Sequence, residues 1–211
     1  MQDGLTFGIE AVVDANRNWV DFRSEADSGI YDAMNRGLDR TAGDYIWFLN
    51  GGDVSTVANW SDLEAIMPGD GGTMVLGAYV LDFGTKSVPR KARSASYIWH
   101  ALPTSHQAIL YPGSSARATK YDLSFKIAGD YAFTARLLQL GVSSVTTSLT
   151  LATFSIGGSS YIHARQIASE ARVVQRQVLD LGVTRVLLSQ IRHATSRLWR
   201  MIAVARNRIS T

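Results

Sequence analysis

The 211-residue sequence contains no cysteine and only 4 prolines. The lack of cysteine excludes disulfides, thiolate zinc sites and cysteine nucleophiles, and it fits a cytoplasmic protein. No apolar run approaches the roughly 18 residues needed to cross a bilayer, and no signal peptide is predicted. With 46% hydrophobic and 18% charged residues, the composition is typical of a globular domain with an appendage.

The net charge of +3 is unevenly distributed along the chain. Residues 1–160 carry 12 Lys and Arg against 16 Asp and Glu, a balance of −4. Residues 161–211 carry 9 Arg against Glu170 and Asp180, a balance of +7. Because nucleic-acid-binding domains usually spread basic residues over the folded face, this distribution argues against nucleic acid as a partner. It predicts a domain over 1–160 followed by a basic helical tail over 161–211.

The stretch 24–53 has the most informative local pattern. Turn residues at 27–29 precede apolar residues at helical spacing, namely Ile30, Met34 and Leu38. Residues 45–49 form an apolar run typical of a strand buried on both faces of a parallel sheet. Asn50-Gly51-Gly52-Asp53 follows directly, so a carboxylate stands at the carboxyl end of a strand, where open α/β sheets bind ligands. By spacing alone, Asp53 could equally cap an ordinary turn.

Later segments predict further strands and helices. A helix is expected over 60–67, and a hairpin is expected from 73–81 and the segment after 87, turning at 82–85. Residues 108–111 and 145–154 are typical of strands. A helix should begin near Asp130 and end at Gly141.

Segments 24–37 and 43–53 closely resemble the nucleotide-sugar-dependent glycosyltransferases of family 2, which often carry SEPDSGIYDAMNKG, then A-G-D-Y and F-L-N-x-x-D. Residues 3–8 partly match a D-G-S-T-D-G-T turn of that family, and 154–160 match its Phe…Gly-Gly-x-Ser stretch. The resemblance covers roughly residues 3–160. It implies an α/β, GT-A-like (Rossmann-like) fold with three α/β/α layers and a mixed, mainly parallel sheet. Because further elements precede this turn in the family, the chain is expected to lack the opening βαβ unit.

The resemblance also assigns a donor side to the site. The usual metal motif is Asp-x-Asp, whereas this chain keeps only Asp53, which is expected to bind Mg²⁺ or Mn²⁺ on the donor diphosphate. The remaining expected contacts to the nucleotide-sugar donor are Asp3, Asp27, Asn35, Asn50 and Gly52.

The acceptor side is expected around Asp130, which resembles the general base of inverting relatives because Tyr131 follows it. Its structural alternative is a helix N-cap. His106 and Gln107 match a His-Gln pair near the acceptor in related enzymes, although a lone histidine is often only a hydrogen-bonded structural residue. Gly157 and Gly158 are expected in a mobile loop over the site. The acceptor would be a saccharide or a lipid-linked molecule.

The tail is predicted to be helical, with a break at 181–182. An apolar arc and an arginine-rich face lie on opposite sides of its last helix, and the arc comprises Leu187, Ile191, Ala194, Leu198, Met201 and Ile202. The arc could pack on the domain, bind an anionic membrane surface or bind a partner.

The predicted function is an inverting, metal-dependent glycosyltransferase of polysaccharide biosynthesis that uses a UDP-linked donor. It would be cytoplasmic, or peripheral on the inner face of the membrane. The alternative is an inactive relative that serves as a binding or membrane-surface module.

Overall fold

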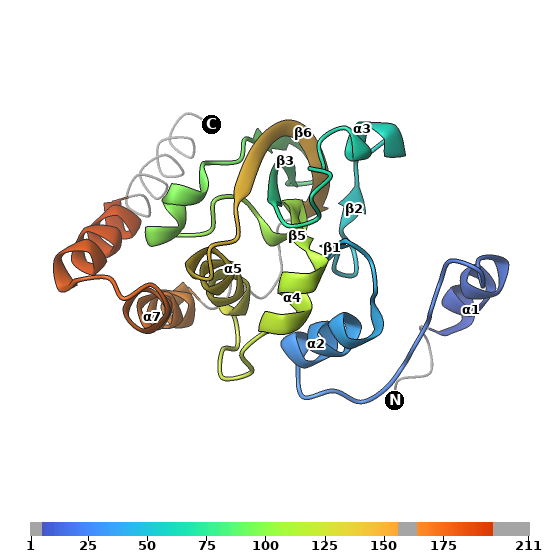
Figure 1. The fold of residues 1–211 in the computed structure, drawn as a ribbon, viewed down its shortest axis with the longest axis horizontal. Coiled ribbons are helices and arrows are strands. Elements are labelled where there is room, and N and C mark those ends of the chain that lie inside the picture. The colour runs from blue at the N-terminus through green and yellow to red at the C-terminus, as the bar shows by residue number, and fades with distance from the viewer. Residues whose placement is uncertain (1–5, 156–163, 196–211) are drawn as a thin grey trace.

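The computed structural model describes residues 6–155 and 164–195. At its centre is a mixed sheet with strand order β1-β5-β3-β6-β2, and β4 pairs with β3 outside this path (Figure 1). The strands are β1 (Tyr45–Trp47), β2 (Val54–Ser55), β3 (Met74–Asp82), β4 (Ser87–Arg90), β5 (Ile109–Pro112) and β6 (Ser144–Ser155).

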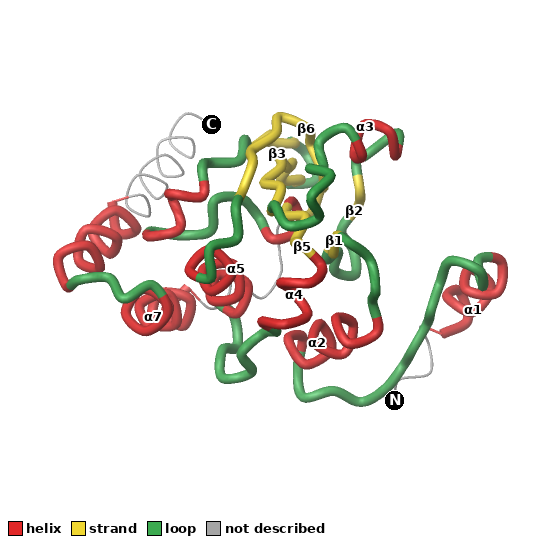
Figure 2. The backbone as a smooth tube through the Cα atoms, in the orientation of Figure 1, coloured by secondary structure: helices red, strands yellow, loops and turns green. Residues whose placement is uncertain are grey.

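The α-helices are α1 (Thr6–Ala15), α2 (Ile30–Arg40), α3 (Trp60–Glu64), α4 (Gly113–Thr119), α5 (Gly129–Gln139) and α7 (Ala164–Val173). Short turns of other helix types are η1 (Ala95–Trp99), η2 (His106–Ala108) and the π-helical η3 (Val174–Val178). A last described helix covers 183–195. Figure 2 shows α1 and the loop after it lying apart from the sheet.

Helices cover both faces of the sheet. Successive strand residues point to opposite faces, so Met74 and Leu76 of β3 join one hydrophobic cluster while Val75 joins another. The first cluster contains side chains from α2, α4, α5 and α7. The second contains Leu63 of α3. The expected α/β fold with a layered, mixed sheet is therefore confirmed.

The pairing of the strands differs from the expected, mainly parallel pattern. Among the described strands only β3 and β6 pair in parallel, and every other pairing is antiparallel. For β3 and β4 the reason is connection length, because a tight turn such as the one at Gly84 (φ 78°) can only join antiparallel strands. The apolar run 45–49, expected as a strand of a parallel sheet, becomes a short strand, β1, that pairs antiparallel with β5 at one end of the strand order.

Helix α2 forms as expected, with a small shift in its buried face. Tyr31, Met34 and Leu38 are buried, whereas Ile30 is 49% exposed. The apolar face of α2 therefore begins at Tyr31 and packs on the main core.

The described part of the tail packs against the same core as the preceding domain. Ala171, Val174 and Leu179 belong to the cluster formed by α2, α4 and α5. The boundary expected at residue 160 therefore does not separate two hydrophobic cores.

Helix 183–195 is attached through polar contacts. Ser189 Oγ lies 2.8 Å from His100 Nδ1 and accepts a hydrogen bond of 2.7 Å from Gln175 Nε2. The described part of the apolar arc faces away from the core instead, since Leu187 is 58% and Ile191 52% exposed. This part of the arc therefore does not pack on the domain.

Candidate functional site

The turn after β1 fixes the carboxylate of Asp53. The amide of Asp53 donates to the Asn50 carbonyl at 3.0 Å, and the Asn50 amide donates to Asp53 Oδ2 at 2.9 Å. Gly52 is the third residue of this turn and has φ 93°, a backbone conformation that favours glycine. Among the described residues no other group is hydrogen-bonded to this carboxylate, so its second oxygen is available to a ligand.

A close approach of Tyr31 determines where α5 begins. The Gly129 amide donates to Tyr31 Oη at 3.0 Å, and Tyr31 Oη donates to the Ile127 carbonyl at 2.7 Å. A Cβ at position 129 would lie 2.5 Å from the Tyr31 ring, so glycine is needed there. Ala128 is the N-cap residue, and Asp130 lies in the first turn of α5. Asp130 is therefore not the helix cap.

His106 lies between Asp130 and Asn50 of the turn that holds Asp53. Its Nδ1 lies 2.9 Å from Asp130 Oδ2, and its Nε2 lies 3.2 Å from Asn50 Nδ2. With the Asn50 amide as donor, Nε2 accepts and the Nδ1 proton is directed at Asp130. The side chains of His106 and Asp130 are only 11% and 17% exposed. Residues from the turn after β1, from η2 and from α5 thus form one continuous polar group.

The negative charges near His106 act on its pKa. Burial alone would lower the pKa of His106, but the charge and hydrogen bond of Asp130, with a smaller contribution from Asp53, raise it above its ordinary value. Among the described residues, the other oxygen of Asp130, Oδ1, is buried without a hydrogen-bond partner. Because buried acceptors normally have donors, this oxygen is an unsatisfied acceptor beside the His106 contact.

The polar atoms of three other predicted residues are hydrogen-bonded elsewhere in the fold. The Gln107 carbonyl accepts from Trp47 Nε1 at 2.7 Å, and its side-chain oxygen accepts from the Ser105 hydroxyl. Asn35 exchanges two hydrogen bonds with the Tyr121 backbone, at 2.9 and 2.7 Å. Asp27 accepts from the Gly29 amide at 3.0 Å before α2.

The structure therefore brings together only part of the predicted set, namely Asn50, Asp53, His106 and Asp130, with Gly52 shaping the turn. Asp3, Gly157 and Gly158 lie outside the described residues, and their roles stay predictions.

Sequence reasoning missed two residues beside the site. Tyr31 lies inside the matched segment 24–37, so that motif could have indicated it. Glu170 of α7 accepts hydrogen bonds from the amides of residues 126–128, just before α5. No local sequence pattern distinguishes Glu170, because its partners lie more than forty residues earlier.

Within the described ranges, no group of three or more His, Cys, Asp or Glu could hold a metal ion. A cation would therefore depend on Asp53 together with ligands that the substrate and water supply. Mg²⁺ is often held in this way, by one or two carboxylates plus phosphate oxygens. The free oxygen of Asp53 fits that mode of binding.

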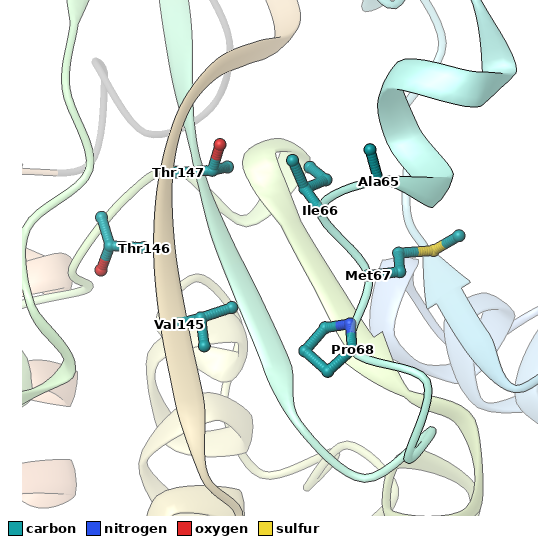
Figure 3. Close-up of a pocket in the computed structure, with 7 residues that line it drawn as sticks. All are labelled: Ala65, Ile66, Met67, Pro68, Val145, Thr146 and Thr147. Atoms are coloured by element: carbon teal, nitrogen blue, oxygen red, sulfur yellow. The ribbon is translucent and has the colours of Figure 1, made fainter.

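A separate hollow of about 360 Å³ lies between β6 and the segment after α3. Figure 3 shows Ile66, Met67 and Pro68 on one side of it and Val145 to Thr147 on the other. It has no acidic, basic or histidine side chain in its lining, unlike the polar group around His106 and Asp130.

Comparisons with known proteins find glycosyltransferases among the sequence relatives. No family model matches the chain. Two uncharacterized glycosyltransferases of Mycobacterium tuberculosis, from strain CDC 1551 / Oshkosh and strain ATCC 25618 / H37Rv, are each 33% identical over 122 residues. These matches cover 54% of this chain and 46% of each relative, so the chain spans about half the length of the curated relatives it matches.

Solved structures show the same arrangement of elements. Staphylococcus aureus TarS 1–349 superposes with a TM-score of 0.57 at 15% identity, covering 87% of this chain and 59% of that one. Its complex with UDP-GlcNAc gives a TM-score of 0.60 at 14% identity, covering 90% and 61%. The chain has the fold of TarS. At this level of identity the likeness concerns the fold alone.

None of the helices in the described ranges has the length and apolarity that crossing a membrane requires.

Proposed function

We propose that this chain is the donor-binding and catalytic part of a glycosyltransferase that uses a nucleotide sugar. The observation that carries the proposal is the His106 ring, which joins Asp130 to the Asn50–Asp53 turn. Named glycosyltransferase relatives and the TarS fold, seen with UDP and UDP-GlcNAc, support it. We further assign the chain to family 2 and the GT-A type, acting by inversion on a saccharide or lipid-linked acceptor in polysaccharide biosynthesis.

The donor would bind at the turn after β1. Asp53 would hold Mg²⁺ or Mn²⁺ through its free carboxylate oxygen, and the Asn50 amide fixes the other oxygen. The cation, when bound, supplies Lewis-acid stabilisation of the diphosphate leaving group. Gly52 carries no Cβ, which allows a ligand to approach the turn backbone closely.

Asp130 would accept the proton of the attacking hydroxyl. Its Oδ1 has no donor among the described residues, while Oδ2 is held by His106. The attack of the acceptor oxygen on the anomeric carbon then breaks the bond to the diphosphate, and the hydroxyl proton passes to Asp130. The Nδ1 proton of His106 would stabilise the ionised carboxylate before attack.

Isothermal titration calorimetry with UDP and UDP-GlcNAc in the presence of Mn²⁺ tests the donor site. We expect wild-type protein to bind, and we expect chelation of the metal or Asp53→Ala to weaken binding about tenfold or more, because the diphosphate loses its counter-charge. Asp62→Ala is the matched control, because Asp62 is exposed on α3 beside a second hollow.

Unchanged affinity in Asp53→Ala would overturn the metal-diphosphate assignment. If wild type binds neither UDP nor UDP-GlcNAc, the alternative of an inactive relative is favoured.

A second role, at an anionic membrane surface, rests on helix 183–195. Ser189, which contacts His100 and Gln175, is buried on the side of the helix that faces the domain. The apolar side chains Val183, Leu187, Leu188 and Ile191 are each more than half exposed. Arg185 and Arg192 lie on the same helix and are exposed. Apolar and basic side chains that share an exposed surface suit the interface of an anionic bilayer. We therefore propose that this helix brings the enzyme to lipid-linked acceptors.

A further inference from the structure

The backbone just before α5 is held by one carboxylate from α7. Glu170 Oε2 accepts from the amides of Ala128 at 2.8 Å, Ile127 at 2.9 Å and Lys126 at 3.1 Å. Three consecutive amides directed at one anion form the kind of concavity that binds negative groups at helix starts. Here the anion is a side chain of the same protein.

Tyr31 of α2 completes the hydrogen bonding of this segment. Its Oη accepts from the Gly129 amide and donates to the Ile127 carbonyl. The Ala128 carbonyl accepts from the Ala132 amide at 3.0 Å, inside the helix start. The amides of 126–129 are thus all bonded, three of them to Glu170. The position of the next residue, Asp130, follows from these contacts.

Glu170 is itself held in place as an anion. Gln166, one turn earlier on α7, donates from Nε2 to Glu170 Oε1 at 2.9 Å. Burial alone would raise the pKa of Glu170, but the backbone amides and Gln166 lower it below its ordinary value. The carboxylate therefore stays ionised at neutral pH, the form that binds amides most strongly.

We propose that Glu170 is a positioning residue for Asp130. By fixing the amides of 126–128, it places the first turn of α5 so that Asp130 Oδ2 reaches His106 Nδ1. The catalytic consequence rests on the proposed function, whereas the placement of Asp130 does not. Helix α7 thereby contributes to the placement of the candidate base.

The first experiment measures the placement without any turnover. The pKa of the His106 ring is followed by NMR in protein labelled at histidine, with His106→Asn used for assignment and Asp130→Asn as the uncoupled reference. We expect Glu170→Ala to lower the His106 pKa toward that reference by about half a pH unit or more, because the attraction to Asp130 weakens. Glu170→Gln keeps an acceptor oxygen and should therefore lower the His106 pKa less than Glu170→Ala does.

The second experiment measures release of UDP from UDP-GlcNAc. Glu170→Ala should lower kcat about 10- to 100-fold with a change in KM of less than about threefold, because a misplaced base affects the reaction more than donor binding. Glu64→Ala, an exposed glutamate on α3, is the control and should match wild type in both experiments.

An unchanged His106 pKa in Glu170→Ala would overturn the proposal. If Glu170→Ala does not fold, Glu170→Asp takes its place, because its shorter side chain cannot reach all three amides. Its His106 pKa and its release of UDP are measured in the same way. If wild type releases no UDP while the pKa still falls, the proposed function fails and the placement by Glu170 stands.

Discussion

A single methyl group at position 129 would disturb the candidate site. The Cβ of Gly129→Ala would lie 2.5 Å from the Tyr31 ring, so Tyr31 or the start of α5 must move. We expect a loss of about 1–3 kcal/mol in the free energy of unfolding, measured in urea, because well-packed sites tolerate added atoms poorly. The same movement should alter the hydrogen bonds of Tyr31 Oη to residues 127 and 129.

Gly37→Ala is the matched control for this substitution. Gly37 lies within α2, and nothing stands within 4 Å of a Cβ built there. Alanine favours helix over glycine, so Gly37→Ala should stabilise by about 0.5–1 kcal/mol. Equal stability of Gly129→Ala and wild type would contradict the tight packing of Tyr31 on α5.

At the scale of elements, helix 183–195 presents its apolar side to solvent and its polar side to the core. Full-length protein should co-sediment with vesicles of phosphatidylcholine and phosphatidylglycerol, and only weakly with phosphatidylcholine alone. Replacing Val183, Leu187 and Ile191 together by Ser should weaken this binding about tenfold or more, because each side chain loses apolar area available for burial.

The triple substitution should leave the fold intact, because all three side chains are already more than half exposed. Leu140→Ser, which changes a 69% exposed leucine at the end of α5, is the control and should bind vesicles like wild type. Equal sedimentation of the triple variant and wild type would remove the membrane role.

For the molecule as a whole, the tail contributes to the main core. Val174 of η3 is fully buried in the cluster that α2 and α5 share, whereas its neighbour Val173 is 37% exposed. We expect Val174→Ala to lower the free energy of unfolding by about 2 kcal/mol, measured by urea denaturation, because two buried methyl groups and their packing are lost. Val173→Ala should cost less than about 0.5 kcal/mol.

If both valines gave the same small effect, the part of the tail after 163 would be a separate appendage. The structure predicts a single cooperative transition instead, since α7 and η3 pack on the helices that carry the site.

The sequence by itself determined the elements whose causes are local. The helix 30–40, the hairpin turn at Gly84 and the break near 181–182 follow from apolar spacing and from residues with special backbone conformations. The resemblance also indicated Asp53, at the end of segment 24–53, and Asp130, which precedes Tyr131, as candidate acids. Their assigned roles stay predictions until binding and turnover are measured.

Only the tertiary structure decided how those acids are connected. His106 bridges Asn50 and Asp130, and Glu170 fixes the backbone before Asp130, through contacts between residues far apart in the chain. Periodicity cannot reveal such contacts, since it reports which face of an element is apolar and not which element covers it. For the same reason the apolar arc of helix 183–195 could be found in the sequence, whereas its exposure followed from Ser189 packing on His100.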